Sequence, residues 1–277
     1  MEKKERNIVF GTGLVLLLLF TFTDLQISLA LANKPFYARI LEVVGEIPFT
    51  VLTLSGCAMI VRFRSRESMI KKWAALLGGG VLFLLFSAMG GIMTWNYLSD
   101  NLGNVPQILI PVISILMAGA AVWITLKVPE ENRRKALRYA AAALIYFLLV
   151  ILVMNSLKTV WGRMRFREMT DPVNEFTRWY QICGRGGFDN AYASFPSGHS
   201  MNSAGVILTL LLPDLIPAWK DKQKPLRICT YAWCIIVGAS RVLMGAHFAS
   251  DVTVGILLSF LLFELTYTLI YRRKGAV

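Results

Sequence analysis

The stretch LRYAAAALIYFLLVILVMNSL, residues 137–157, contains a single charged side chain, that of Arg138. About 20 consecutive apolar residues are enough for an α-helix to cross the hydrocarbon core of a bilayer. The whole chain of 277 residues is 56% hydrophobic and 17% charged, which is more apolar than one water-soluble core requires. The sequence therefore predicts an all-α protein, a polytopic transmembrane helical bundle of about eight spans, at 8–32, 36–61, 73–97, 107–126, 137–157, 199–213, 228–244 and 248–271.

We expect a single membrane domain over residues 1–277, because no low-complexity linker or internal repeat interrupts the spans. The first span has charged flanks but no small-residue cleavage site after a short apolar core, so it is predicted to be retained and not removed as a signal peptide. The span at 199–213 is the weakest of the eight, because Pro213 and Pro217 shorten it.

The net charge of +12 is a signal of topology and not of nucleic-acid binding. When alternate loops are assigned to one side of the membrane, 20 of the 29 lysine and arginine residues fall on the side of the two termini and nine on the other. Lysine and arginine are enriched in cytoplasmic loops. The chain is therefore expected in the cytoplasmic membrane, with both termini in the cytoplasm and no nucleic-acid partner.

One outward loop, residues 158–193, is longer than a simple connection between helices. Its aromatic content is too high for a disordered linker. Two interpretations are open, an aromatic belt at the membrane interface and a lid over a site. The aromatic residues are Trp161, Phe166, Phe176, Trp179, Tyr180, Phe188 and Tyr192.

The four cysteines indicate neither a disulfide framework nor a metal site. Only Cys183 lies in an outward loop, so no disulfide is expected on the oxidising side. The chain has two histidines and no pair of cysteines at metal-ligand spacing. We expect no metal and no cofactor.

Both histidines lie where outward loops meet apolar spans. His199 ends the sequence Pro-Ser-Gly-His that directly precedes the sixth span. His247 is followed four residues later by Asp251, a spacing that places both side chains on one face if the segment is helical. Such a carboxylate can accept the Nδ1 proton and leave Nε2 as a free lone pair.

Cationic side chains accompany these histidines on the same side of the membrane. Lys158 and Arg165 are seven residues apart at the outer end of the fifth span, about two helical turns, so a continuing helix would point both the same way. Together with Arg241 and the backbone N–H groups of Ser197 and Gly198, they form a set of donors suited to phosphate oxygens.

The three motifs, in this order, resemble those of the type-2 phosphatidic acid phosphatase superfamily of integral membrane phosphatases. They are K-x6-R, P-S-G-H and S-R-x5-H-x3-D, within residues 158–251. The resemblance covers roughly 137–271 and implies a core of six helices, here residues 73–277, preceded by extra spans in 1–72. The family's first motif usually ends in Arg-Pro, whereas Phe166 follows Arg165 here.

The resemblance implies a role for each motif residue. His247 is the expected nucleophile, Asp251 its orienting partner, and His199 the general acid that protonates the leaving oxygen. The expected phosphate cradle consists of Lys158, Arg165, Ser197, Gly198 and Arg241.

These roles imply a metal-independent membrane phosphatase that hydrolyses a lipid-linked phosphate or diphosphate at the outer face through a phosphohistidine. Undecaprenyl diphosphate, phosphatidylglycerophosphate and phosphatidic acid remain open as substrates. A lipid phosphotransferase and a non-catalytic protein that binds or transports anionic lipids are the alternatives. A vanadate-dependent oxidase, which shares the constellation on soluble scaffolds, is disfavoured by the eight spans.

Further charged residues lie outside the motifs. Attraction to lipid headgroups explains four arginines, Arg163, Arg167, Arg178 and Arg185, as well as a second phosphate site would. Acidic residues inside membrane spans are costly and need partners. We therefore expect interhelical pairing for Asp24, Glu42, Glu46 and Glu264.

Overall fold

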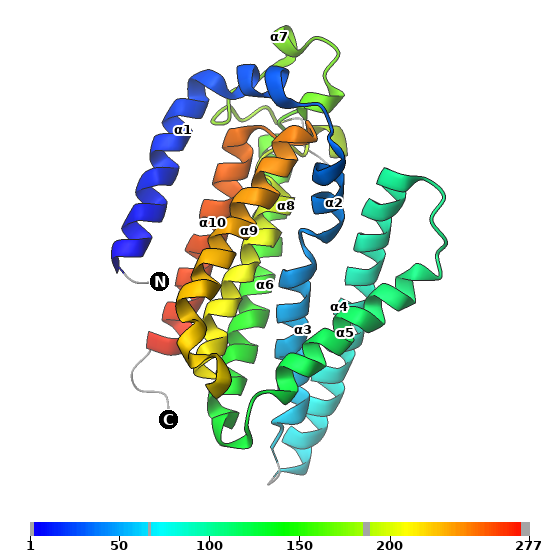
Figure 1. The fold of residues 1–277 in the computed structure, drawn as a ribbon, viewed down its shortest axis with the longest axis vertical. Helices are drawn as coiled ribbons and strands as arrows, with labels where there is room; N and C mark the ends of the chain where they lie inside the picture. The colour runs from blue at the N-terminus through cyan, green and yellow to red at the C-terminus, as the bar shows by residue number, and fades with distance from the viewer. Residues whose placement is uncertain (1–2, 66–67, 185–188, 273–277) are drawn as a thin grey trace. The chain divides into compact units, whose positions relative to one another are not determined.

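The computed structural model describes residues 3–65, 68–184 and 189–272. Their regular structure is entirely helical, without a β-strand in these ranges (Figure 1). The α-helices are α1 (Lys3–Leu31), α2 (Phe36–Val44), α3 (Ile47–Arg62), α4 (Met69–Leu102), α5 (Leu109–Leu126), α6 (Arg133–Trp161), α7 (Pro172–Glu175), α8 (Gly198–Ser203), α9 (Gln223–Leu243) and α10 (Ala249–Tyr267). Short 3₁₀ turns and one π-helical turn connect or extend them, at Glu130–Asn132, Phe166–Glu168, Asn190–Tyr192, Ala204–Asp214, Pro217–Lys222 and Thr268–Arg272.

Seven of the eight predicted spans are confirmed as helical segments long and apolar enough to cross a membrane. Each segment contains an apolar stretch with at most two charged side chains. This is expected because an unpaired polar group in hydrocarbon costs several kcal/mol. Their bounds are Lys3–Leu31, Phe36–Arg62, Met69–Leu102, Leu109–Leu126, Glu130–Trp161, Pro217–Leu243 and Ala249–Arg272. The fold class is therefore the polytopic helical bundle that the hydropathy predicts.

The eighth predicted span, 199–213, has a different structure from the other seven. It begins as the short helix α8 and continues as a 3₁₀ helix over Ala204–Asp214, with Pro213 inside it. A 3₁₀ helix rises about 2.0 Å per residue against about 1.5 Å in an α-helix, so the two pieces together extend about 31 Å. This length matches the roughly 30 Å of a bilayer core although the segment has few residues.

The described chain forms two compact units that alternate along the sequence. The first unit comprises Met1–Gly45, Leu149–Gly205 and Ala232–Glu264. The second comprises Glu46–Leu148, Val206–Tyr231 and Leu265–Val277. These units do not coincide with the predicted division of the single domain at residue 72, which stays a prediction. All the predicted site residues belong to the first unit.

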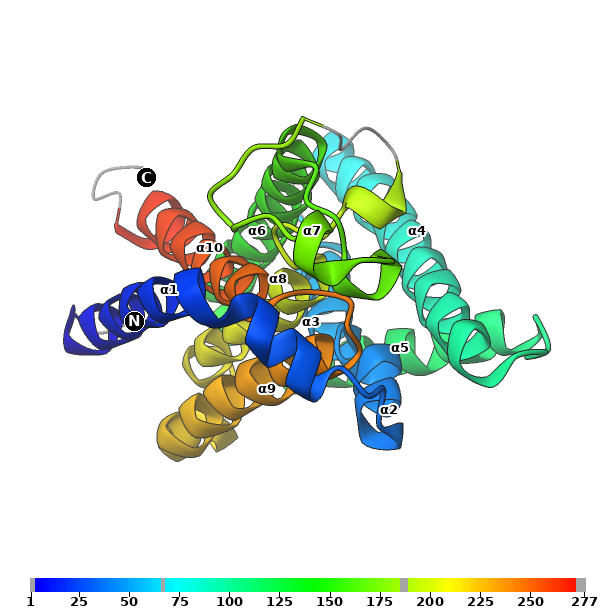
Figure 2. The ribbon, with the colours of Figure 1, turned by 90° about the horizontal axis from the view of Figure 1, so that it is seen from above.

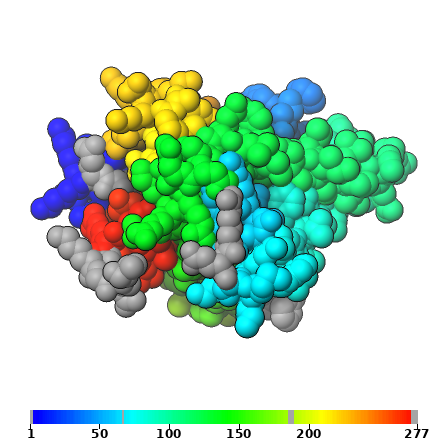
Figure 3. All heavy atoms as spheres, turned by 90° about the horizontal axis from the view of Figure 1, so that it is seen from below, coloured from blue at the N-terminus to red at the C-terminus, as the bar shows by residue number. Residues whose placement is uncertain are grey.

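The second unit is held together by aromatic and apolar contacts between α3, α4, α5 and α6. Phe49 of α3 and Tyr146 of α6 meet edge to face with ring centroids 5.6 Å apart. The hydroxyl of the buried Tyr139 donates to the Leu52 carbonyl at 3.1 Å. Asn132 donates to the Leu215 carbonyl at 2.9 Å. Figure 3, seen from below, shows the green and yellow segments next to each other.

In the first unit, α1 packs against α10 and the last turn of α9. Phe20 and Ile27 of α1 contact a buried apolar cluster formed by Val242, Ala249 and Val252. The burial of such side chains contributes roughly 1.5–3 kcal/mol each. This packing brings the first predicted span beside the helix that follows His247.

Candidate active site

The first motif lies at the point where α6 ends. Lys158 is in the last turn of α6, which ends at Trp161, and Gly162 follows in the left-handed region with φ 62°. Arg165 is extended, with φ −76° and ψ 142°, and its N–H donates to the Ala191 carbonyl at 2.8 Å. The condition under which Lys158 and Arg165 would point the same way, a continuing helix, is therefore not met, because α6 ends at Trp161.

Phe166 does not alter the backbone that the family's proline would require. A proline forces the preceding residue into an extended conformation, and Arg165 already has one. Its guanidinium Nη2 donates to Asn190 Oδ1 at 2.7 Å. The departure from the family motif therefore leaves Arg165 in place.

The second motif begins α8. Ser197 is the N-cap residue, and its Oγ accepts a hydrogen bond from Ser200 N at 3.3 Å. A Cβ added to Gly198 would lie 3.0 Å from Lys158 Nζ, so the ammonium group lies directly against this glycine. His199 follows in the first turn of α8 and is 5% exposed. The structure thus brings together the first and second motifs.

The third motif lies in the turn between α9 and α10. Arg241 is in the last turn of α9, and its carbonyl accepts hydrogen bonds from Ala246 N at 3.1 Å and His247 N at 3.3 Å. Gly245 allows this turn with φ 62°. Ser197 N donates to the Asp251 carbonyl at 3.0 Å, which joins the second and third motifs. The prediction that this N–H binds a phosphate oxygen is therefore wrong, because the carbonyl already occupies it.

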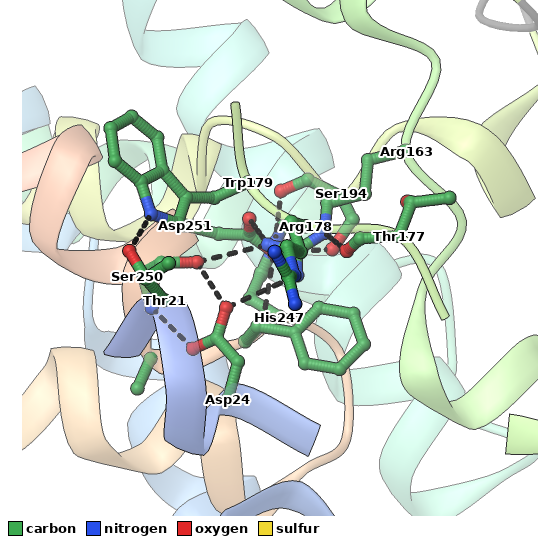
Figure 4. A network of polar contacts seen from close by, with 12 residues as sticks. Thr21, Asp24, Arg163, Thr177, Arg178, Trp179, Ser194, His247, Ser250 and Asp251 are labelled. Carbon is green, nitrogen blue, oxygen red and sulfur yellow. Dashed lines mark hydrogen bonds and ion pairs between the residues drawn. The ribbon is translucent and has the colours of Figure 1, made fainter. Parts of the chain in front are cut away.

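The hydrogen bond of His247 corrects the predicted role of Asp251 (Figure 4). His247 precedes α10 and is not helical, so the spacing of four residues does not place its ring beside the carboxylate. Its Nδ1 lies 2.7 Å from the Ser194 carbonyl oxygen. Asp251 instead accepts from Ser194 Oγ at 2.6 Å and from Phe248 N at 2.9 Å. Asp251 therefore contacts Ser194, whose carbonyl in turn contacts His247.

The tautomer of His247 nevertheless follows from this contact. A carbonyl oxygen can only accept a hydrogen bond, so Nδ1 must carry the proton. Nε2 is then left with a free lone pair. The predicted tautomer, with the proton on Nδ1, therefore holds, but the acceptor of that proton's hydrogen bond is the Ser194 carbonyl and not the Asp251 carboxylate.

Arg163 is the largest fully buried side chain among the described residues, at 0% exposed. It donates to Asp251 Oδ1 at 2.6 Å and to Asp24 Oδ2 at 3.1 Å. Its guanidinium carbon lies 4.1 Å from the centre of the Phe248 ring. Removing one partner of a buried ion pair typically costs about 3–5 kcal/mol. The headgroup interpretation is therefore wrong for Arg163.

The other three arginines of that set differ from Arg163. Arg167 pairs with its neighbour Glu168 at 3.2 Å, and Arg178 is exposed. For both, attraction to headgroups and a second phosphate site stay open as interpretations. Arg185 lies outside the described residues.

Interhelical ion pairing is confirmed for two of the four acidic residues, Glu42 and Glu264. Asp24 of α1 pairs with Arg163, which lies in the loop after α6. Glu42 of α2 lies 2.7 Å from Arg241 Nη2, and Glu264 of α10 lies 3.9 Å from Arg6 of α1. For Glu46 the pairing stays a prediction. Asp24 and Glu42 could be singled out in the sequence because each is an acidic residue inside an apolar span. Nothing in the sequence indicated which basic residues they would contact.

Three of the predicted cationic side chains influence the pKa of His247. Burial lowers the pKa of His247 well below the ordinary value of an imidazole, and the positive charges of Arg165, Lys158 and Arg241 lower it further. The ring is therefore uncharged at neutral pH, as a nucleophile must be. Arg241 is 2% exposed, and its Nε and Nη1 form no hydrogen bond within the described residues.

No group of three histidine, cysteine, aspartate or glutamate side chains is placed to hold a metal ion within the described ranges. The charged groups that act on His247 are instead the cations of Arg165, Lys158 and Arg241. Such donors stabilise the negative oxygens of a phosphoryl group.

The long loop that follows α6 is anchored to α6 and α1. Trp161 Nε1 donates to the Trp179 carbonyl at 2.6 Å, and Trp179 Nε1 donates to Thr21 Oγ1 at 3.0 Å. Seen from above, α7 and this loop lie in front of α8 (Figure 2). Phe188, one of its predicted aromatic residues, lies outside the described residues. Belt and lid both stay open as interpretations.

Comparisons with known proteins agree with this site. The family model described as the PAP2 superfamily matches residues 137–274. Phosphatidylglycerophosphatase B of Bacillus subtilis (strain 168) is 42% identical over 74 residues, which are 26% of this chain and 36% of that protein. The chain thus aligns with little more than a third of that relative's length. No solved structure matches the chain. Residues 137–274, which hold all three motifs, therefore belong to the PAP2 superfamily.

Proposed function

We propose that the protein is a metal-independent membrane phosphatase that hydrolyses a lipid-linked phosphate. The observation that carries this proposal is the environment of His247. Its Nδ1 is hydrogen-bonded to a carbonyl, its Nε2 is a free lone pair, and three cations act on its pKa. A neutral imidazole surrounded by fixed positive charge is suited to attack an anionic phosphoryl group.

In the first step, Nε2 of His247 attacks phosphorus and forms a P–N bond while the P–O bond to the lipid breaks. His199 gives its proton to the departing oxygen, so the lipid leaves as an alcohol or as a lipid monophosphate. Lys158, Arg165 and Arg241 stabilise the charge on the equatorial oxygens. Asp251 accepts a hydrogen bond from the Ser194 hydroxyl, and the Ser194 carbonyl accepts one from Nδ1 of His247.

In the second step, a water molecule replaces the imidazole on phosphorus. His199, now neutral, accepts a proton from the water as the P–O bond forms and the P–N bond breaks. Inorganic phosphate is released, and both histidines return to their starting protonation states.

The first substrate to test is phosphatidylglycerophosphate, since a relative with 42% identity over the aligned residues carries the name phosphatidylglycerophosphatase B. Phosphatidic acid and undecaprenyl diphosphate follow. Phosphotransfer to an alcohol would use the same first step. Binding or transport without chemistry would use the cations but would not need the Nε2 lone pair.

The test is phosphate release by the purified full-length protein from these three lipids, with and without EDTA and orthovanadate. We expect release that survives EDTA and is inhibited by orthovanadate, which mimics the pentacoordinate phosphoryl group. Phosphate that appears only on an added alcohol would identify a phosphotransferase. Binding of all three lipids without turnover would identify a binding protein, and activity restored only by Mg²⁺ would contradict the electrostatic mechanism.

The lowered pKa of His247 predicts the acid limb of the pH profile. Protonated His247 is no nucleophile, so kcat/KM falls only as pH drops through its lowered pKa, below about pH 6.5. Replacing Arg165 by glutamine removes a nearby positive charge and raises that pKa. The acid limb of Arg165→Gln should therefore move to higher pH, whatever is lost in phosphate binding. A limb that stays in place would show that another group titrates.

We place the active site at the outer face of the cytoplasmic membrane, with both termini inside. Two termini on one side require an even number of crossings, and the length of the α8 segment, about 31 Å, permits an eighth. Cys183, in the outward loop, is then expected to react with a membrane-impermeant thiol reagent on intact cells. Cys229, near the start of α9, is the matched control and should react only after permeabilisation. The opposite pattern would place the site in the cytoplasm.

A further inference from the structure

The helices α1 and α2 lie before the residues that match the PAP2 family, yet both carry buried carboxylates into the site. Asp24 of α1 is 1% exposed and Glu42 of α2 is 6% exposed. Membrane spans exclude unpaired acids because their burial is costly. Each of these acids has a cationic partner within or beside the motifs.

Asp24 caps the helix that follows His247. Its Oδ1 accepts from Ser250 N at 2.9 Å, in the first turn of α10, and its Oδ2 accepts from Ser250 Oγ. A carboxylate at this end of a helix satisfies free N–H groups and interacts favourably with the helix dipole. The cap of α10 is thus supplied by a different helix.

The same carboxylate holds Arg163, and a continuous chain of contacts then leads to His247 (Figure 4). Arg163 binds Asp251 at 2.6 Å. Asp251 accepts from Ser194 Oγ at 2.6 Å, and the Ser194 carbonyl accepts from His247 Nδ1 at 2.7 Å. Every member of this chain is buried. Displacement of Arg163 would therefore disturb the group that fixes the tautomer.

Glu42 holds the cation at the other side of the site. Its Oε1 accepts from Arg241 Nη2 at 2.7 Å. Nε and Nη1 of Arg241 form no hydrogen bond with any described residue, so this contact orients the guanidinium with two donors left over. Each N–H of a guanidinium can donate a charge-assisted hydrogen bond to a phosphate oxygen.

A third contact brings the end of α2 to His199. Gly45 follows α2, and a Cβ added there would lie 3.2 Å from His199 Nε2. Its carbonyl accepts from Trp233 Nε1 of α9 at 3.1 Å. The chain around α2 therefore borders both Arg241 and the predicted general acid.

From these contacts we infer that α1 and α2 are part of the catalytic apparatus, with Asp24 a positioning residue for His247 and Glu42 a positioning residue for Arg241. This inference rests on the proposed phosphatase function. Neither acid touches the reacting atoms. Asp24 acts on the nucleophile and hence on turnover, whereas Glu42 acts on a phosphate ligand and hence on binding.

The test compares Asp24→Asn and Glu42→Gln in the full-length, membrane-embedded protein. Asp24→Asn is expected to lower kcat at least about tenfold with KM within about threefold of wild type. Glu42→Gln is expected to weaken orthovanadate and substrate binding at least about tenfold with a smaller effect on kcat. Asp24→Glu restores a carboxylate and should recover part of the lost turnover. It also serves as the test variant if Asp24→Asn does not fold.

Arg6→Gln is the matched control, because Arg6 and Glu264 join the same helices, α1 and α10, at 3.9 Å. It should leave both kcat and KM unchanged. Equal losses of kcat in Asp24→Asn and Arg6→Gln would show that Asp24 only connects helices, and would overturn its role as a positioning residue. Unchanged orthovanadate affinity in Glu42→Gln would overturn the role of Glu42.

Two readouts do not require turnover, so they separate this inference from the proposed function. Orthovanadate binding can be measured calorimetrically, and the chain has only two histidines, whose labelled imidazoles can be resolved by NMR. We expect the His247 signals to change in Asp24→Asn and not in Arg6→Gln. A wild-type protein without turnover would contradict the proposed function alone. Unchanged His247 signals in Asp24→Asn would contradict the positioning role alone.

Discussion

Replacement of His247 by alanine is expected to abolish phosphate release from every substrate. The described site offers no other neutral imidazole with a free Nε2 at this position, and a covalent intermediate needs that lone pair. The loss should reach the limit of detection with lipid and with p-nitrophenyl phosphate alike. Phosphate release by the purified variant measures it.

His247→Asn is the matched control for the fold. The amide of asparagine can donate to the Ser194 carbonyl, as Nδ1 does, but it has no nucleophilic nitrogen. We expect this variant to remain folded, to bind orthovanadate and to be inactive. Substantial turnover by either variant would rule out a phosphohistidine on His247.

Replacement of His199 by alanine is expected to produce a loss that depends on the leaving group. A general acid typically contributes about 10² to 10⁴ in rate, and a lipid alkoxide needs its proton in order to depart. p-Nitrophenolate is stable as an anion. His199→Ala should therefore lose about 10² to 10⁴ with a lipid phosphate but far less with p-nitrophenyl phosphate.

The comparison with His247→Ala separates the two roles. Only His199→Ala should show this rescue by a good leaving group. Equal losses on both substrates would show that His199 binds phosphate instead of delivering a proton. His199 would then join the cradle of Lys158, Arg165 and Arg241.

The prediction of spans was correct where the hydropathy of a single segment decides its structure. A stretch such as 137–157 must be helical in a bilayer because its backbone groups can be satisfied only within the segment. The span at 199–213 was less predictable, since its 3₁₀ portion reaches the same length with fewer residues. Hydropathy windows assume the rise of an α-helix and do not register this difference.

The site predictions depended on assumptions about local backbone. The helical condition of both spacing arguments is not met, because α6 ends before Arg165 and His247 precedes α10. The motif residues were nevertheless identified together, since the types of side chain in P-S-G-H and S-R-x5-H-x3-D match a family pattern that covers the same residues. Identity of residues was more informative than their spacing.

The sequence alone determined the helical membrane fold, the motifs and the excess of positive charge around them, because each is a property of a short segment or of composition. Only the tertiary structure decided which groups touch. Asp24 and Arg163 are 139 positions apart, and Glu42 and Arg241 are 199 positions apart. Contacts over such separations depend on how whole helices pack, and buried carboxylates and guanidinium groups must find each other because neither is stable alone in that environment.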